Sequence, residues 1–135
     1  MKKMIPYEKL SEAEKEQLKQ LLAASGMLAE LDEHQMDAAA GSTGCGPAYA
    51  ALFVEALADG AVACGLPRRQ ALQYAAQMLK GTAELLLETG EHPASLKDRV
   101  CSPAGSTIQG VRCLEESAFR AAVMNAVIAA VEKKF

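Results

Sequence analysis

Alanine is the residue that most constrains what this chain can fold into. The 135 residues include 26 alanines but only 14 valine, isoleucine and threonine residues together. Alanine has the highest helix propensity, whereas β-branched residues are the ones that favour strands. A chain of this length has room for one ordinary domain. We therefore expect an all-α fold, a helical bundle.

Residues that start and stop helices divide the chain into successive helical segments. Ser11–Glu14 has the form of a capping box, and Asp32 with Gln35 suggests a second one. Prolines suited to a first helical turn and glycines suited to a helix end mark most of the other boundaries. The predicted helices run from Ser11 to near Gly26, from Asp32 toward Ala40, from about Pro47 to Cys64, from Pro67 to about Thr89, from Pro93 to Val100, from Ser106 or Thr107 onward, and after Ser117.

Two segments of small and hydroxyl residues interrupt this pattern, and we expect the chain to break there. Gly41–Pro47 holds three glycines, and Cys101–Thr107 holds two serines, a threonine and a glycine. Each stands before a predicted helix, whose free backbone amides attract anions. In the second segment the hydroxyls add donors, so a small carboxylate is the natural ligand. The alternative is that both segments are simply capped turns.

Charge and hydropathy exclude several classes of protein. The formal net charge is −3 and no basic stretch is present, so neither nucleic acid nor an anionic membrane is an expected partner. The apolar run Ala121–Val131 is eleven residues long. A membrane span needs roughly 20. Pro6 and Glu8 come before any apolar region can develop, which argues against a secretory signal and for a cytoplasmic protein.

The cysteines and histidines do not suggest a metal site. The cysteines stand singly, without a Cys-x-x-Cys pair, and are expected to be free thiols. They are Cys45, Cys64, Cys101 and Cys113. His34 and His92 are expected at helix starts or on the surface. A dinucleotide-binding fingerprint is absent too, because Tyr49 stands where a third glycine after Gly44 and Gly46 would be needed.

The last predicted helix is apolar over more than half of its circumference. Phe119, Val123, Ala126 and Val127 lie on one stripe, and further alanines lie on the neighbouring faces. Such a helix must be covered on two sides, for which a chain of this size has little material. We therefore expect a dimer in which alanine-rich faces pack together.

Seven short motifs carry a resemblance to a known family. They are Gly44-Cys-Gly-Pro-Ala-Tyr49, Glu55-Ala-Leu-Ala-Asp-Gly60, Gly65-Leu-Pro67, Glu91-His-Pro93, Leu96-Lys-Asp98, Ser102-Pro-Ala-Gly-Ser-Thr107 and Phe119-Arg120. In this order and spacing they closely resemble the C-terminal half of pyrroline-5-carboxylate reductase, the last enzyme of proline synthesis. The resemblance covers nearly everything from Ser11 to Lys133.

The resemblance implies how the chain is organised. It implies a helical domain of the 6-phosphogluconate dehydrogenase C-terminal type, which intertwines with its twin into a dimer that can assemble into a decamer. Residues 1–10 are then an N-terminal extension or linker remnant, and residues 11–135 are the dimerisation domain. The family's Rossmann domain, which holds NAD(P)H, is expected to be absent, so the isolated chain should have negligible activity. The competing hypothesis is a stand-alone helical oligomerisation module with no ligand site.

The resemblance also implies the site. The carboxylate of pyrroline-5-carboxylate or proline would rest on the segment Ser102–Thr107, with Thr107 as the catalytic residue. The Thr107 hydroxyl would hydrogen-bond the ring nitrogen and assist its protonation as hydride arrives at the imine carbon. The implied substrate-binding residues are Ser102, Ala104, Gly105, Ser106 and Thr107, and those implied to face the nicotinamide are Gly44, Cys45, Gly46 and Pro47.

Four positions depart from the usual family pattern. Cys45 replaces a common serine, Cys101 a threonine or serine, Ala104 the first of two glycines, and Ser106 a frequent threonine. A methyl group at Ala104 is expected to strain a backbone conformation that suits glycine, or to crowd the substrate ring.

The expected dimer generates a prediction about the last helix. Replacing Ala126 or Ala130 by leucine should break the assembly, because overpacking a helix–helix contact typically costs about 1–3 kcal/mol per site. Light scattering of the purified variants measures this directly. An unchanged dimer mass would contradict the placement of these alanines at the contact.

Overall fold

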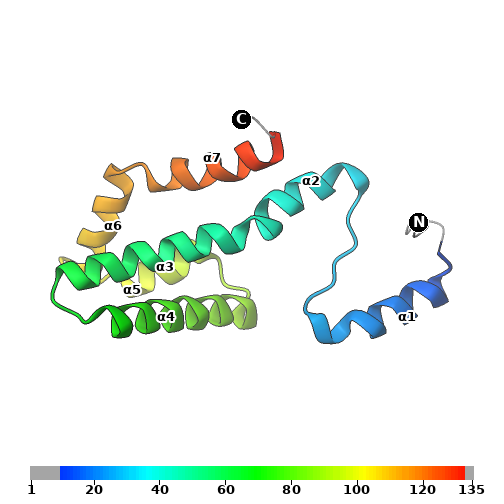
Figure 1. Cartoon of the computed structure of the whole chain (residues 1–135), viewed down its shortest axis with the longest axis horizontal. Coiled ribbons are helices and arrows are strands. Elements are labelled where there is room, and N and C mark those ends of the chain that lie inside the picture. Colours follow the sequence, from blue (N-terminus) through cyan, green and yellow to red (C-terminus); the bar gives the residue numbers. More distant parts are fainter. Residues whose placement is uncertain (1–9, 133–135) are drawn as a thin grey trace. The chain divides into compact units, whose positions relative to one another are not determined.

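The computed structural model describes residues 10–132, and its regular elements are all helical (Figure 1). The elements are α1 (Glu12–Leu22), η2 (Ala23–Ser25), η3 (Glu33–Gln35), α2 (Met36–Ala39), η4 (Ala40–Gly44), α3 (Gly46–Ala63), α4 (Arg68–Thr89), α5 (Pro93–Val100), α6 (Ser106–Glu116) and α7 (Phe119–Glu132). The all-α prediction is confirmed. The predicted N-terminal extension, residues 1–10, lies outside the described residues except for Leu10. No helix in the described range is long and apolar enough to cross a membrane.

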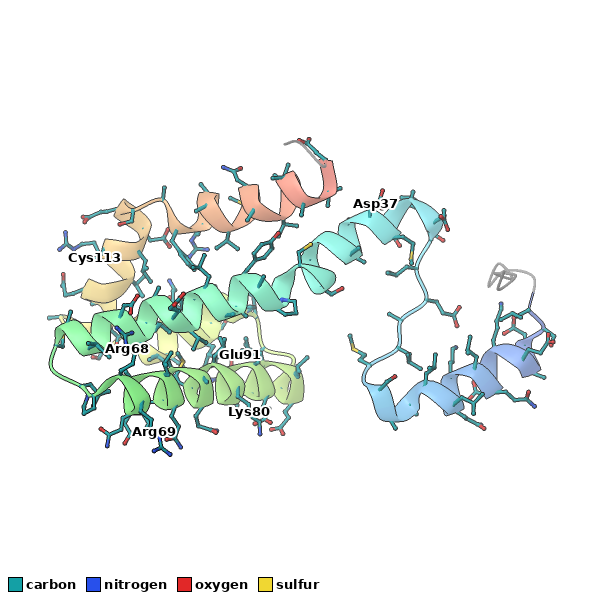
Figure 2. The ribbon with its side chains drawn as sticks, in the orientation of Figure 1. Asp37, Arg68, Arg69, Lys80, Glu91 and Cys113 are labelled. Atoms are coloured by element: carbon teal, nitrogen blue, oxygen red, sulfur yellow. The ribbon has the colours of Figure 1, made fainter. Side chains whose placement is uncertain are left out.

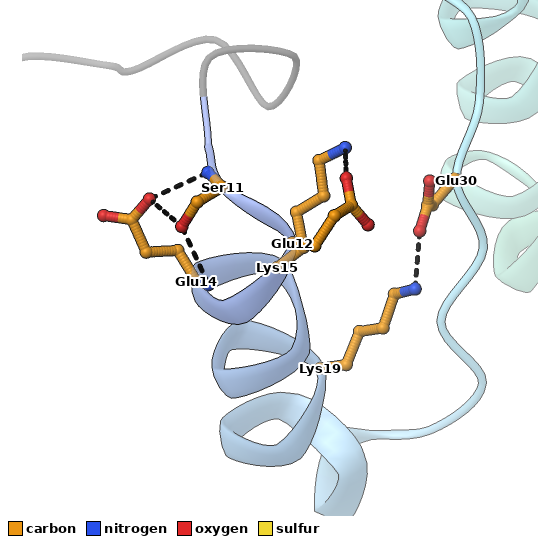
Figure 3. A network of polar contacts seen from close by, with 6 residues as sticks. All are labelled: Ser11, Glu12, Glu14, Lys15, Lys19 and Glu30. Atoms are coloured by element: carbon orange, nitrogen blue, oxygen red, sulfur yellow. Dashed lines mark hydrogen bonds and ion pairs between the residues drawn. The ribbon is translucent and has the colours of Figure 1, made fainter.

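The chain divides into two compact units, Met1–Met36 (unit 1) and Asp37–Phe135 (unit 2). Unit 1 contains α1, which begins with the predicted capping box (Figure 3). The Glu14 amide donates to Ser11 Oγ at 3.4 Å, and the Ser11 amide donates to Glu14 Oε2 at 2.8 Å. Hydrogen bonds from the Ser11 side chain and then from its backbone lower the pKa of Glu14. Both bonds satisfy amides without an intrahelical partner, which is why α1 begins where the sequence predicts.

Unit 2 is built on the antiparallel pair α3 and α4, which lie side by side (Figure 1). The only buried side chains in this pair are small, namely those of Ala58, Ala71 and Ala75. Small residues at a contact let two helix backbones approach closely. Gly65, at a φ of +100°, turns the corner between the helices, and an ion pair between Asp59 and Arg68 spans it.

The C-terminal helix α7 packs against η4, the segment that precedes α3, and it contacts α3 itself through individual side chains (Figure 1). Gly41 is buried there, and a Cβ at this position would lie 2.6 Å from Val131 Cγ2. The Tyr49 hydroxyl donates to the Ala126 carbonyl at 3.1 Å. The Phe53 and Phe119 rings meet with their centroids 5.8 Å apart. Close packing at Gly41 therefore ties α7 to η4, and a hydrogen bond and a ring contact tie α7 to α3.

The break predicted at Gly41–Pro47 is wrong. The chain stays helical through η4, a single π-helical turn in which the Cys45 amide donates to the Ala40 carbonyl at 3.2 Å. Only Cys45 separates η4 from α3, and its φ of −87° and ψ of −23° are helical as well. A wide π turn accommodates an extra residue within a helix. Of the three glycines, Gly41 serves the close approach of α7.

Large apolar side chains of unit 2 remain exposed. Leu52 on α3 is 67% exposed, and Met124 and Ile128 on α7 are 58% and 50% exposed. Singly scattered apolar residues are normal on a protein surface, but contiguous ones on neighbouring helices mark an interaction surface. One copy of unit 2 thus leaves much of its apolar surface uncovered.

The close packing at Gly41 generates a prediction with a matched control in the same turn. Gly41→Ala should lower the free energy of unfolding by about 1–3 kcal/mol, because the new methyl group meets Val131. Gly44→Ala meets no atom within 4 Å and should be neutral or stabilising by up to about 1 kcal/mol, since alanine favours helix. Urea unfolding at one fixed protein concentration measures both. Equal effects would contradict the contact between Gly41 and α7.

Candidate functional site

The segment between α5 and α6 forms a tight turn. The Gly105 amide donates to the Ser102 carbonyl at 3.0 Å, which closes a turn over Pro103 and Ala104. Proline in the second position and a positive φ in the third, +59° at Ala104, are the pattern of a type II turn. The third position of such a turn favours glycine. The sequence-based expectation of a glycine-type conformation at Ala104 therefore matches the geometry.

Gly105 allows the turn to close directly onto α6. It is the N-cap residue of that helix, and a Cβ on it would lie 3.1 Å from the Ser102 carbonyl oxygen and closer still to Ser102 Oγ. Any side chain at this position would have to push Ser102 away. The glycine thus keeps the Ser102 hydroxyl next to the first turn of α6.

The first turn of α6 presents donors to solvent. Helix N-termini leave their first amides without intrahelical partners, and no side chain caps those of Ser106, Thr107 and Ile108. The hydroxyls of Ser102, Ser106 and Thr107 are exposed and form no hydrogen bond within residues 10–132. The positive end of the helix dipole adds to their attraction for an anion. This arrangement can bind a small carboxylate.

Short-range contacts fix α5, the helix that leads into the turn. His92 caps it, with Nδ1 accepting from the Ala94 amide at 3.2 Å. Glu91, labelled in Figure 2, pairs with Arg99 in the last turn of α5 at 2.8 Å. Lys97 pairs with Asp98, whose carboxylate raises the pKa of the ammonium group, and the nearby Cys101 adds a smaller raising effect. His92 is thus the helix-start residue that the sequence predicts.

The other predicted segment, Gly44–Pro47, lies elsewhere on unit 2. It sits at the N-terminal end of α3, whereas α6 and its turn lie near the other end of that helix (Figure 1). No hydrogen bond within residues 10–132 joins the two segments. At Gly44 and Gly46 a Cβ would meet no atom within 4 Å, so the backbone face there is open. The chain therefore keeps the two predicted halves of the site apart.

An apolar groove between α3 and α7 was not predicted from the sequence. It encloses about 470 Å³ and is lined only by aromatic, leucine, valine and alanine side chains. Tyr49, Phe53 and Ala56 come from α3, and Phe119, Val123 and Ala126 come from α7. Burial together with Cys45 raises the pKa of the Tyr49 hydroxyl, which stays protonated and bonded to α7. The helical spacing of these residues is the sequence signal that could have revealed the groove.

Residues 33–134 match the family described as pyrroline-5-carboxylate reductase dimerisation. This chain belongs to that reductase family. It is 49% identical over 131 residues to pyrroline-5-carboxylate reductase of Synechocystis, covering 97% of this chain and 47% of that protein. It is 56% identical over 93 residues to the Escherichia coli reductase, covering 69% of this chain and 35% of that protein.

Solved structures show the same relationship. The Plasmodium falciparum pyrroline carboxylate reductase with NADP bound matches at a TM-score of 0.84 and 37% identity, over 93% of this chain and 50% of that one. The chain therefore spans about half the length, or less, of the reductases that it matches. The family match also begins at residue 33, after α1.

The left-handed alanine in the turn generates a prediction. Ala104→Gly should raise the free energy of unfolding by up to about 1 kcal/mol. Glycine removes the steric strain of an alanine with positive φ, and this gain exceeds the cost of the greater conformational entropy that glycine gives the unfolded chain. Ala83→Gly, at an exposed position inside α4, should lower it by about 0.5–1 kcal/mol. Thermal unfolding of both variants measures the contrast. Two changes of the same sign would rule out strain at Ala104.

Proposed function

We propose that this chain supplies the dimerisation and substrate-binding part of a pyrroline-5-carboxylate reductase, which reduces 1-pyrroline-5-carboxylate to L-proline with NAD(P)H. The observation that carries the proposal is the turn Ser102–Gly105 at the start of α6. It presents uncapped amides and three exposed hydroxyls in a chain of this family. The substrate is a small ring with one carboxylate, which is the kind of anion such a helix start binds.

Each group of this turn has a distinct role in the proposed reaction. The amides of Ser106 and Thr107 bind the carboxylate, which orients the ring over the turn. Reduction adds a hydride to the imine carbon and a proton to the imine nitrogen, so that the C=N bond becomes CH–NH. The Thr107 hydroxyl hydrogen-bonds that nitrogen and assists its protonation. Its contribution is orientation and acid assistance.

A nicotinamide cofactor supplies the hydride when it is bound. The open backbone at Gly44 and Gly46 leaves room for a flat ring against the segment Gly44–Pro47, which supports a role for this segment on the nicotinamide side. The described residues include no strand, and therefore none of the strand–turn–helix motif that binds a dinucleotide. The larger part of the cofactor surface would belong to another domain of the reductase.

A second copy of the chain completes the proposed arrangement. The groove between α3 and α7 and the exposed Leu52, Met124 and Ile128 supply the apolar surface that an obligate dimer buries. Because Gly44–Pro47 and Ser102–Thr107 lie at opposite ends of α3, a partner has to bring them together if both serve one site. Assembly of such dimers into a decamer is the further expectation from the family resemblance.

An NMR titration of the isolated chain with L-proline tests the substrate half of the proposal. Saturable amide shifts confined to Ser102–Thr107 are the expected result. An absence of shifts at high proline would contradict ligand binding by this chain. It would favour the second hypothesis, a helical oligomerisation module without a ligand site. The exposed apolar surfaces of α3 and α7 would be sufficient for such a module.

The role of Thr107 gives a prediction with a conservative control. Thr107→Ala should weaken proline binding about tenfold, because a hydrogen bond to a charged group contributes about 1.5–3 kcal/mol. Thr107→Ser keeps the hydroxyl and should bind within about twofold of the original chain. The NMR titration gives both dissociation constants, and urea unfolding shows whether the fold is unchanged. Equal losses of binding and stability in Thr107→Ala would make Thr107 a structural residue of α6.

A further inference from the structure

In one copy of the chain, the order of α5 rests on contacts within its own segment. The helix has eight residues, and none of them is buried. In the described part of the chain α5 does not pack extensively against another helix. A helix this short is marginal in water without support from packing, because its first turn is costly to form. The residues that close its two ends therefore decide how well α5 is ordered.

His92 satisfies the amides at the start of α5. Pro93 has no amide proton, and the Ala94 amide donates to His92 Nδ1 at 3.2 Å. The Ser95 amide donates to the His92 carbonyl at 2.9 Å. Nδ1 can accept a hydrogen bond only while the imidazole is neutral, because protonation places a hydrogen on that nitrogen. A positive charge at this end of a helix also opposes the helix dipole. Protonation of His92 therefore uncaps α5.

An ion pair ties the start of α5 to its last turn. Both carboxylate oxygens of Glu91, the residue before His92, accept from Arg99 Nη1, at 3.0 and 2.8 Å. Glu91 is labelled in Figure 2. Its amide donates to Thr89 Oγ1 at the end of α4, at 3.2 Å. The start of α5 is thus held to α4 on one side and to the last turn of α5 on the other.

The end of α5 leads directly into the candidate carboxylate site. The Cys101 amide still donates to the Lys97 carbonyl at 3.1 Å, in the helical manner. Ser102 follows at once, and its carbonyl accepts from the Gly105 amide to close the turn. A movement of the last turn of α5 therefore carries Ser102 with it.

The neighbouring charges leave the imidazole without an ionic partner. The charged residues between the last turn of α4 and the end of α5 are Glu88, Glu91, Lys97, Asp98 and Arg99. The last four form two ion pairs with one another. Within residues 10–132, no carboxylate of α3, α4 or α5 forms an ion pair with His92. The cap therefore depends on the proton state of the imidazole itself.

We propose that His92 is a positioning residue of the carboxylate site, and that its neutral form keeps the turn at Ser102 in the binding conformation. The proposal rests on the proposed function, which supplies the carboxylate. Protonation removes the cap and loosens the start of α5 and, through Glu91 and Arg99, its last turn. The fraction of chains with the turn in its binding conformation then falls, and the apparent affinity falls with it.

Amide NMR of the ligand-free chain tests the coupling directly. Histidine changes its charge between about pH 8 and pH 5.5, and His34 in unit 1 is the other histidine of the sequence. The amide signals of Ser102–Thr107 should shift with the same midpoint as the ring signals of His92. His92→Asn should abolish this shift, because asparagine caps a helix at any pH in this range. His34→Asn is the matched control and should leave the shift unchanged.

Titration with L-proline measures the consequence for binding. L-proline keeps the same charges over this pH range, so a change in its affinity reports on the protein. Its dissociation constant should rise about threefold or more from pH 8 to pH 5.5 with the unmodified chain, and less than about 1.5-fold with His92→Asn. His92→Ala has no acceptor, so it should bind at pH 8 as weakly as the unmodified chain does at pH 5.5.

Each outcome decides either the coupling or the proposed function. Signals of Ser102–Thr107 that ignore pH, or that respond equally in His92→Asn, would overturn the positioning role. An unchanged response in Arg99→Met would overturn transmission through the Glu91–Arg99 pair. The amide signals of α3 and α7 show whether each variant is folded. Absence of proline binding at both pH values would contradict the proposed function alone, because the signals of the ligand-free turn still decide the coupling.

Discussion

Close approach of helix backbones through alanine and glycine is the constraint on which the rest of unit 2 depends. The α3–α4 pair buries Ala58, Ala71 and Ala75. Gly41 is buried where η4 meets α7. Contacts of this kind bury little area per residue, so the larger apolar side chains are left to point outward. The same feature that lets four segments pack tightly also creates the surface on which a second copy would pack.

The helix boundaries could be predicted because they depend on neighbouring residues. The capping box at Ser11–Glu14 and the start of α5 at Pro93 are set by side chains within one turn, and both are where the sequence places them. The segment Gly41–Pro47 shows the opposite case. Its glycines favour a loop by local rules, but the packing of Val131 against Gly41 decides the outcome. Val131 is far away in sequence, so local rules could not foresee the π turn.

The candidate site likewise has one part that depends on neighbouring residues and another that depends on tertiary packing. The turn at Ser102–Gly105 is closed by its own residues, and the sequence predicted a loop there. The glycine-type conformation at Ala104 was expected from the family resemblance. The groove between α3 and α7 and the bond from Tyr49 to Ala126 join residues from separate helices. Only the tertiary arrangement brings them together. The separation of Gly44–Pro47 from Ser102–Thr107 along α3 is likewise a property of the fold rather than of either motif.

The exposed apolar face of α3 and α7 has a consequence for how such a chain is handled in solution. A fold that completes its core with a second copy draws part of its folding free energy from association, which follows mass action. The midpoint temperature of its thermal unfolding then rises with protein concentration, and dilution lowers its stability. In a single copy Leu52 and Met124 are exposed to water, whereas in the proposed dimer they would lie in the interior.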